Sequence, residues 1–266
     1  MWRFGNLWAG NEASYEALIA VSAQVSAMIG SGQQAPLPEL LHIDSGVGVV
    51  SIEGALIPGD AGFYSYFGYV GYNDIRTAAM AAVMNPDVKS IMLHMNSPGG
   101  AVDGCQDCAN MLAQISSLKP TMVFADNSLG SGAYWLATSA GKIFISTTTE
   151  AGSVGVIAKA AEYSKARAAA GITDLVVRSG PYKQLINPVE PHSDAGIAML
   201  QERVNAIADV FLEHVSDARG VSAKQFDATM GQGRVFTGAK AVAVGIVDGL
   251  ATYDSALSAA ILIQPR

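Results

Sequence analysis

Short apolar runs alternate with stretches of helical periodicity along most of the chain. The runs of four to six residues predict strands, and apolar residues spaced three and four apart predict helices. The predicted strands are 47–52, 90–95, 121–125, 142–146 and 175–178, and the predicted helices are 73–84, 103–118, 133–140, 158–170 and 193–219. Strands that alternate with helices indicate an α/β fold with a mostly parallel sheet and crossover helices.

The first 38 residues differ from the rest of the chain. Residues 12–30 have helical spacing and end at Gly30, and residues 31–38 have the composition of a linker. We therefore expect two parts: an N-terminal helix and linker at 1–38, suited to contact a neighbouring subunit, and a single domain at 39–266. Residues 60–72 are rich in aromatic side chains and glycine, which is consistent with a lid, a subunit contact or simple core packing.

Composition excludes several classes of function. The 266 residues are 50% hydrophobic and 15% charged, which suits one large domain with a sizeable core. The net charge is −7 and Lys and Arg do not cluster, so we expect no nucleic-acid partner. No run approaches the roughly 18 apolar residues of a membrane span, and the N-terminus lacks a signal-peptide pattern. A soluble protein without an integral membrane segment is the expectation.

Metal and redox chemistry find little support. The four histidines, His42, His94, His192 and His214, lack metal-ligand spacing, and Cys105 and Cys108 form one isolated C-x-x-C pair within a predicted helix. We expect two buried thiols, with redox chemistry as the alternative, and no metal or cofactor.

Candidate chemistry lies between residues 96 and 138. The strand at 90–95 leads into Asn96-Ser-Pro-Gly-Gly100, and the strand at 121–125 leads into Gly130-Ser-Gly-Ala-Tyr-Trp135. Two strand–turn–helix corners at the same end of neighbouring parallel strands would place backbone N–H groups beside the Ser131 hydroxyl. This arrangement suits a nucleophile with an oxyanion site, and the alternative is a pair of ordinary strand–helix turns.

A serine nucleophile requires a base, because the free hydroxyl is a weak nucleophile. No histidine occurs between His94 and His192. A lysine can act instead if burial lowers its pKa from about 10.4 towards about 7 to 8. Of the eight lysines, Lys183 stands out in a Gly-Pro-Tyr segment near apolar Leu185 and Ile186, although a surface loop lysine is the plainer interpretation.

Five motifs occur in order along the chain: Asn96-Ser-Pro-Gly-Gly100, Gly130-Ser-Gly-Ala-Tyr-Trp135, Gly152-Ser-Val-Gly-Val-Ile157, Ser179-Gly-Pro-Tyr-Lys183, and Gly233-Arg-Val-Phe-Thr-Gly238 continuing to Asp248. Together they resemble the signal peptide peptidase A family of serine peptidases, whose fold is related to ClpP and the crotonases. The resemblance spans roughly residues 45 to 258 and implies repeated strand–strand–helix units. It implies a Ser-Lys dyad of Ser131 and Lys183, with an oxyanion hole at the N–H groups of Gly100 and Gly132. Ser153 is implied more weakly as a support for the dyad.

The resemblance also implies partners and a setting. The compact form, with Leu7-Trp-Ala-Gly before the core, is similar to the phage and prophage branch related to the phage lambda head protein C. That branch implies a homo-oligomeric ring, for example an octamer, that processes phage scaffold or capsid proteins in the bacterial cytoplasm or the procapsid. Membrane-derived or signal peptides are the other substrate class that the resemblance implies.

The sequence differs from the family pattern in two respects, and two alternative functions remain open. Ala133 stands where the nucleophile motif has a second glycine, and we expect no membrane anchor of the kind that typical signal peptide peptidases carry. One alternative is a crotonase-type acyl-CoA enzyme with the same kind of oxyanion hole. The other is a non-catalytic assembly protein that forms a ring.

Overall fold

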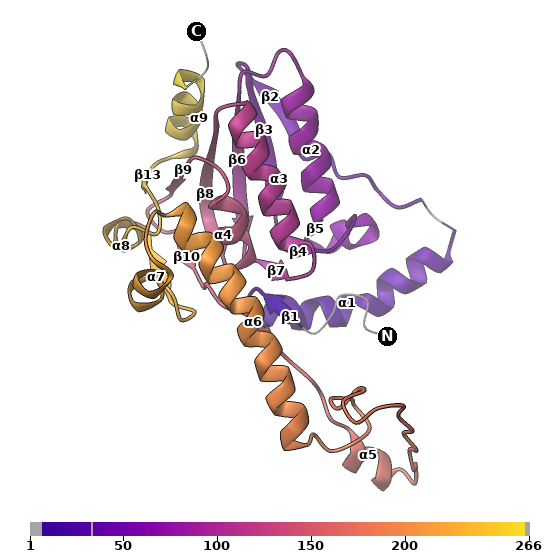
Figure 1. Ribbon diagram of the computed structural model, residues 1–266. Coiled ribbons are helices and arrows are strands. Elements are labelled where there is room, and N and C mark those ends of the chain that lie inside the picture. The colour runs from indigo at the N-terminus through magenta and orange to yellow at the C-terminus, as the bar shows by residue number, and fades with distance from the viewer. Residues whose placement is uncertain (1–6, 33, 264–266) are drawn as a thin grey trace.

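The computed structural model describes residues 7–32 and 34–263. These residues form a mixed α/β fold on two sheets, with a long helix that extends away from the main body (Figure 1). Most strand pairs are parallel, which confirms the predicted fold class.

The larger sheet forms the centre of the fold. In the described part of the chain it has eight strands in the order β12-β10-β8-β6-β3-β2, with β9 beside β8 and β13 beside β9. Its strands are β2 (Leu41–Asp44), β3 (Val47–Glu53), β6 (Ser90–Ser97), β8 (Thr121–Gly130), β9 (Lys142–Ile145), β10 (Glu150–Gly152), β12 (Val235–Thr237) and β13 (Gly249–Leu250). The predicted strands at 47–52, 90–95, 121–125 and 142–146 are confirmed, and β6 and β8 continue into the turns that follow them.

Helices cover both faces of this sheet, which explains why its strands are continuous apolar runs. Ile91 and Leu93 pack in the cluster that includes α2 and α3, whereas Met92 packs against α9. The helices are α2 (Tyr72–Met84), α3 (Cys105–Leu118), α4 (Gly132–Ala137) and α9 (Tyr253–Leu262). The predicted helices at 73–84 and 103–118 are confirmed, and α4 is shorter than predicted.

The smaller sheet lies beside the carboxyl ends of the central strands. Its order is β11-β1-β7-β4-β5, from β1 (Leu7–Ala9), β4 (Ala55–Ile57), β5 (Tyr69–Gly71), β7 (Gly100–Ala101) and β11 (Ile157–Ala158). The N-terminal helix α1 (Glu12–Gly30) and the 3-10 helix η1 (Gly62–Phe67) pack on it. Leu18 and Val25 of α1 share a buried cluster with Phe63 and Tyr64, so core packing accounts for these aromatic residues. The contact of residues 1–38 with another subunit stays a prediction.

Residues 159–192, here called the arm, leave the body at β11 and return to it through a long helix. This helix is α6 (Asp194–Ala218), followed by α7 (Ala223–Thr229) and α8 (Gly238–Val244), and the arm lies at its far end (Figure 1). The predicted helix at 158–170 is wrong in extent, since only α5 (Ser164–Ala169) forms, and the predicted strand at 175–178 is absent. Leu175 and Val177 are 88% and 84% exposed, so this apolar run has neither a partner strand nor a core to face.

In the part of the chain that the structure describes, no helix combines the length and the apolar composition needed to cross a membrane.

Candidate active site

Ser131 occupies a sharp turn between β8 and α4. Its φ of 50° and ψ of −117° lie in a region that L-residues rarely adopt, and Ser131 is only 1% exposed. The turn is held from both sides: the Ser131 N–H donates to the Gly152 carbonyl at 2.7 Å, and the Ser131 carbonyl accepts from the Trp135 N–H at 2.9 Å. Strained backbone that neighbouring structure enforces in this way is concentrated at functional sites.

The Ser131 hydroxyl faces a hollow of about 630 Å³. It donates a long hydrogen bond of 3.4 Å to the Gly155 carbonyl and does not cap α4. Residues 153–157, the middle of α6 and residues 232–233 line the hollow together with Trp8 and Gly10. Among the described lining residues there is neither lysine nor histidine, so the hydroxyl lacks a basic partner there.

The N–H groups of Gly100 and Gly132 converge beside Ser131. A methyl group at Gly132 would lie 3.5 Å from the Gly100 nitrogen, and one at Gly99 would lie 2.8 Å from the Gly132 nitrogen. Gly132 begins α4, so its N–H has no partner within the helix, and the described hydrogen bonds give it none elsewhere. The structure therefore brings Ser131, Gly100 and Gly132 together, in an arrangement suited to an oxyanion hole.

Gly100 also shows why glycine is needed at this corner. A methyl group there would lie 2.0 Å from the Leu56 carbonyl oxygen and 2.5 Å from the Leu56 nitrogen, because β7 packs directly on β4. The close backbone approach fixes the position of the Gly100 N–H.

Ser153 lines the same hollow on a second turn with positive φ, 56°. Its N–H donates to the Arg234 carbonyl at 2.7 Å, which ties the turn to the segment before β12. Since no described hydrogen bond joins its hydroxyl to Ser131, the supporting role of Ser153 stays a prediction.

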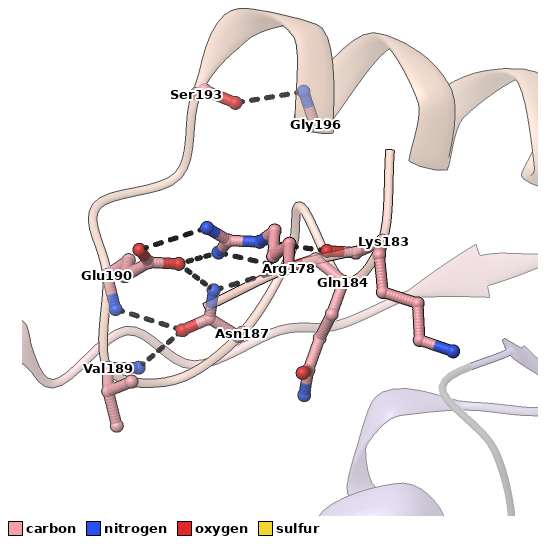
Figure 2. A network of polar contacts seen from close by, with 8 residues as sticks. All are labelled: Arg178, Lys183, Gln184, Asn187, Val189, Glu190, Ser193 and Gly196. Carbon is pink, nitrogen blue, oxygen red and sulfur yellow. Dashed lines mark hydrogen bonds and ion pairs between the residues drawn. The ribbon is translucent and has the colours of Figure 1, made fainter. Parts of the chain in front are cut away.

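Lys183 lies on the arm, outside the hollow that Ser131 faces. The residue is exposed, and none of the described hydrogen bonds or ion pairs involves its Nζ. Figure 2 shows its side chain pointing away from the neighbouring polar groups. Within one chain the structure does not bring Lys183 into contact with Ser131.

The loop that carries Lys183 is nevertheless well organised. The Arg178 Nε donates to the Lys183 carbonyl at 2.8 Å, and the same guanidinium pairs with the Glu190 carboxylate (Figure 2). Asn187 completes the network: its Nδ2 donates to Glu190 at 2.6 Å, and its Oδ1 accepts from the backbone of 189 and 190 at 3.0 Å. Asn187 is the one buried residue of the arm, all of which the structure describes. A polar network, rather than a hydrophobic core, thus shapes this loop.

The helix α6 separates the arm from Ser131. Asn205 lines the hollow and Asp194 begins the helix, eleven residues earlier (205 − 194 = 11). At about 1.5 Å per residue, the helix places the end of the arm roughly 16 Å along its axis from Asn205.

The cysteine pair is buried in the core. Cys105 and Cys108 are free and buried on α3, and burial raises the pKa of each thiol to about 12. Both therefore stay as neutral thiols at physiological pH and pack as small apolar groups. Among the described residues, no group of three or more His, Cys, Asp or Glu side chains is placed to hold a metal.

Sequence reasoning missed two features of the site. One is the Gly155 carbonyl that accepts the Ser131 hydroxyl, although the motif containing it stands out in the sequence. The other is the segment Leu7–Gly10, which lies against the corner; three residues of strand are too few to give a periodic signal.

Comparison with known proteins identifies relatives of this chain. The model of peptidase family S49 matches residues 113–262. Capsid assembly protease C of Escherichia phage lambda is 29% identical over 82% of this chain and 49% of its own length. A putative signal peptide peptidase SppA of Enterococcus faecium is 29% identical over 78% of this chain and 60% of its own length. The chain thus spans about half the length of the curated relatives it matches. Among solved structures, a ClpP1 mutant of Listeria monocytogenes has a TM-score of 0.47 at 12% identity, over 77% of this chain and 92% of that one.

Proposed function

Since the chain belongs to peptidase family S49, we propose that it is a serine endopeptidase in which Ser131 is the nucleophile and Lys183 the general base. The observation that carries the proposal is the Ser131 turn: a buried serine in a strained conformation, with the Gly100 and Gly132 amides converging beside it. The family match independently favours peptide hydrolysis over the acyl-CoA and assembly alternatives.

The proposed reaction is acyl transfer. The neutral Lys183 amine takes the Ser131 proton while Oγ attacks the peptide carbonyl, and the Gly100 and Gly132 N–H groups stabilise the oxyanion. The lysine ammonium then donates its proton to the leaving amine, and water hydrolyses the acyl-enzyme. Removing one oxyanion donor from sites of this kind typically costs about 3 kcal/mol, so the two backbone amides account for a large part of the expected rate.

We place the two halves of the dyad on different copies of the chain. Lys183 is exposed on an arm that α6 holds away from its own Ser131, while Ser131 lacks a basic group among the described residues around it. The arm also exposes apolar side chains, with Leu175 at 88%, Val177 at 84% and Tyr182 at 70%. Docking the arm against a second copy would bury this surface and desolvate the lysine, which favours the neutral amine over the ammonium.

A head-to-tail contact of this kind generates a ring when its rotation closes, which agrees with the expected homo-oligomer. The relatives are named as a capsid assembly protease and a signal peptide peptidase. We propose phage scaffold or capsid proteins as substrates, cleaved in the host cytoplasm or the procapsid, with membrane-derived peptides as the second substrate class.

Covalent labelling tests the proposal. We expect a fluorophosphonate to add one adduct to Ser131 of the wild-type chain, detected by intact mass and peptide mapping, and casein to be cleaved. Ser131→Ala should take no adduct, and Lys183→Ala should label and cleave at background rates, whereas Lys165→Ala, on the same arm, should behave like wild type. Unlabelled Ser131 in the wild-type protein, or a fully active Lys183→Ala variant, would contradict the assignment.

A further inference from the structure

The segment Leu7–Ala9 lies in a gap between two strands that flank Ser131. It runs antiparallel to β7, which carries Gly100, and antiparallel to β11, which follows the Gly152-Ser-Val-Gly turn. The register places Trp8 opposite Ala101 and Ile157, and Ala9 opposite Gly100. An extended peptide that adds as a strand between two edges is a common mode of peptide recognition. The chain's own N-terminal segment thus occupies a peptide-shaped site next to the candidate nucleophile.

The Ala9 carbonyl oxygen lies at the proposed oxyanion hole. The Val102 N–H donates to the Leu7 carbonyl at 3.4 Å, and hydrogen-bonded pairs recur at every second residue of an antiparallel ladder. Ala9 and Gly100 therefore form the next such pair, in which the Gly100 N–H faces the Ala9 carbonyl. A methyl group at Gly99 would lie 2.1 Å from this oxygen, and one at Gly132 would lie 3.0 Å from it. A substrate carbonyl at the point of attack would occupy the same position.

The residue after Ala9 also fits tightly. A methyl group at Gly10 would lie 2.5 Å from the Trp8 Nε1 and 2.9 Å from the Gly100 nitrogen, so glycine suits this position. The buried Trp8 ring lies against Gly10, and its Nε1 donates to the Asn11 carbonyl at 3.1 Å and to the Ser14 Oγ at 3.3 Å. Gly10 and Ser131 line the same hollow. The chain is therefore held before the Ala9–Gly10 bond by the ladder with β7 and after it by the Trp8 contacts.

We propose that the Ala9–Gly10 peptide bond is a substrate of Ser131, so that the chain removes its own N-terminal strand. The proposal rests on the function proposed above, with the Lys183 amine as the base. Ser131 Oγ forms a bond to the Ala9 carbonyl carbon and its proton passes to the amine. The Ala9–Gly10 C–N bond then breaks, and the proton returns to the Gly10 nitrogen to give a free amine. Water hydrolyses the Ala9 ester and leaves an Ala9 carboxylate.

This assignment has a consequence for other substrates. While Leu7–Ala9 pairs with β7 and β11, no second peptide can add a strand there. Cleavage leaves the released strand attached only through non-covalent contacts, so an external peptide can displace it. The first turnover would thereby open the site for later ones.

The experiment compares the N-terminus of the full-length chain with that of its Ser131→Ala variant, purified in the same way. We expect intact mass and N-terminal sequencing to show loss of residues 1–9 and a new N-terminal Gly10 in the wild type, rising to more than about nine-tenths of chains on incubation. The Ser131→Ala variant should keep residues 1–9, which excludes cleavage by contaminating proteases.

Fluorophosphonate labelling of the same samples separates this inference from the proposed function. If wild-type chains keep residues 1–9 while Ser131 takes the label and casein is cleaved, the self-cleavage is refuted and the peptidase assignment stands. If the N-terminus stays intact and Ser131 takes no label, both are refuted. Loss of residues 1–9 from the Ser131→Ala variant at the wild-type rate would also overturn the inference, since another nucleophile must then be responsible.

Discussion

The corner around Ser131 comprises the turns at 96–100 and 130–135, and the arm at 159–192 carries Lys183. Different interactions hold these two regions in place. At the corner, backbone packs on backbone: Ser131 is 1% exposed, and Gly100 lies so close to Leu56 that no side chain fits. On the arm, exposed residues predominate, and a polar network around Glu190 and Asn187 fixes the loop. The corner has a nucleophile and oxyanion amides without a base, whereas the arm has an exposed amine without a buried site. Each region supplies what the other lacks.

This difference indicates which properties a mutation should change. A substitution that adds atoms at the corner acts on a closely packed backbone, so it should affect stability and activity together, whereas removal of the Ser131 hydroxyl alone should affect activity. A substitution on the arm removes few buried contacts, so it should affect activity with little change in stability.

The nucleophile should have the largest effect. We expect Ser131→Ala to lower casein cleavage by roughly a millionfold, to the level that binding and oxyanion stabilisation alone provide. Circular dichroism should show an unchanged fold, because only the hydroxyl is removed. Ser117→Ala, an exposed serine on α3, is the matched control and should retain full activity. Residual cleavage within tenfold of wild type would show that another group is the nucleophile.

Gly100→Ala should be the most destabilising single change in the comparison. Its methyl group would meet the Leu56 carbonyl oxygen at 2.0 Å, so β7 or β4 must shift, at a cost of at least about 3 kcal/mol in the free energy of unfolding. Gly180→Ala on the arm meets nothing within 4 Å and should change this free energy by less than about 0.5 kcal/mol. If urea unfolding shows equal losses of unfolding free energy for the two variants, the proposed difference between corner and arm is contradicted.

A substitution of Asp248 tests how a half-buried charge stabilises the body of the protein away from the site. Burial alone would raise its pKa, but hydrogen bonds from Arg219 and from the Ile143 N–H hold the pKa below its usual range. Because the folded-state pKa is lower than the unfolded one, the unfolded chain binds more protons as the pH falls, and stability is lost from about pH 4 through the lower folded-state value. Asp248→Asn should cost about 2 kcal/mol at pH 7 and reduce the acid dependence of unfolding. The exposed Asp87→Asn should change neither quantity measurably.

Glu190→Gln should affect stability less than Gly100→Ala or Asp248→Asn does. The Arg178 and Glu190 side chains are 23% and 34% exposed, so losing the charge should change the unfolding free energy by less than about 1 kcal/mol. The loop that displays Lys183 should nevertheless loosen, with faster limited proteolysis within 178–190 and a lower kcat on casein. Asp174→Asn breaks another ion pair of the arm, with Arg167, and should leave kcat nearly unchanged. A kcat for Glu190→Gln equal to that of Asp174→Asn would show that the network does not position Lys183.

The sequence predicted the body of the protein better than the arm. Periodicity was sufficient for β3, β6, α2 and α3, because one continuous core imposes it. Around Ser131, the two glycine-rich turns follow parallel strands and lie close together, with Gly100 near Gly132, while their role as an oxyanion hole stays a prediction. The apolar run at 175–177 was misleading, since Leu175 and Val177 remain exposed in the single chain. The placement of Leu7–Ala9 was not predictable from three residues, because it depends on the gap between β7 and β11 that only the fold creates.

Subunit mixing shows whether Lys183 of one copy acts on Ser131 of another. Ser131→Ala and Lys183→Ala are each expected to be inactive, and co-expression places both in the same oligomers. If Lys183 acts on the Ser131 of a neighbouring copy, about one quarter of the sites in randomly mixed rings regain both residues, and casein cleavage returns to about that fraction of wild type. If native mass spectrometry shows mixed oligomers but cleavage stays at the level of the single variants, the dyad is not shared between copies.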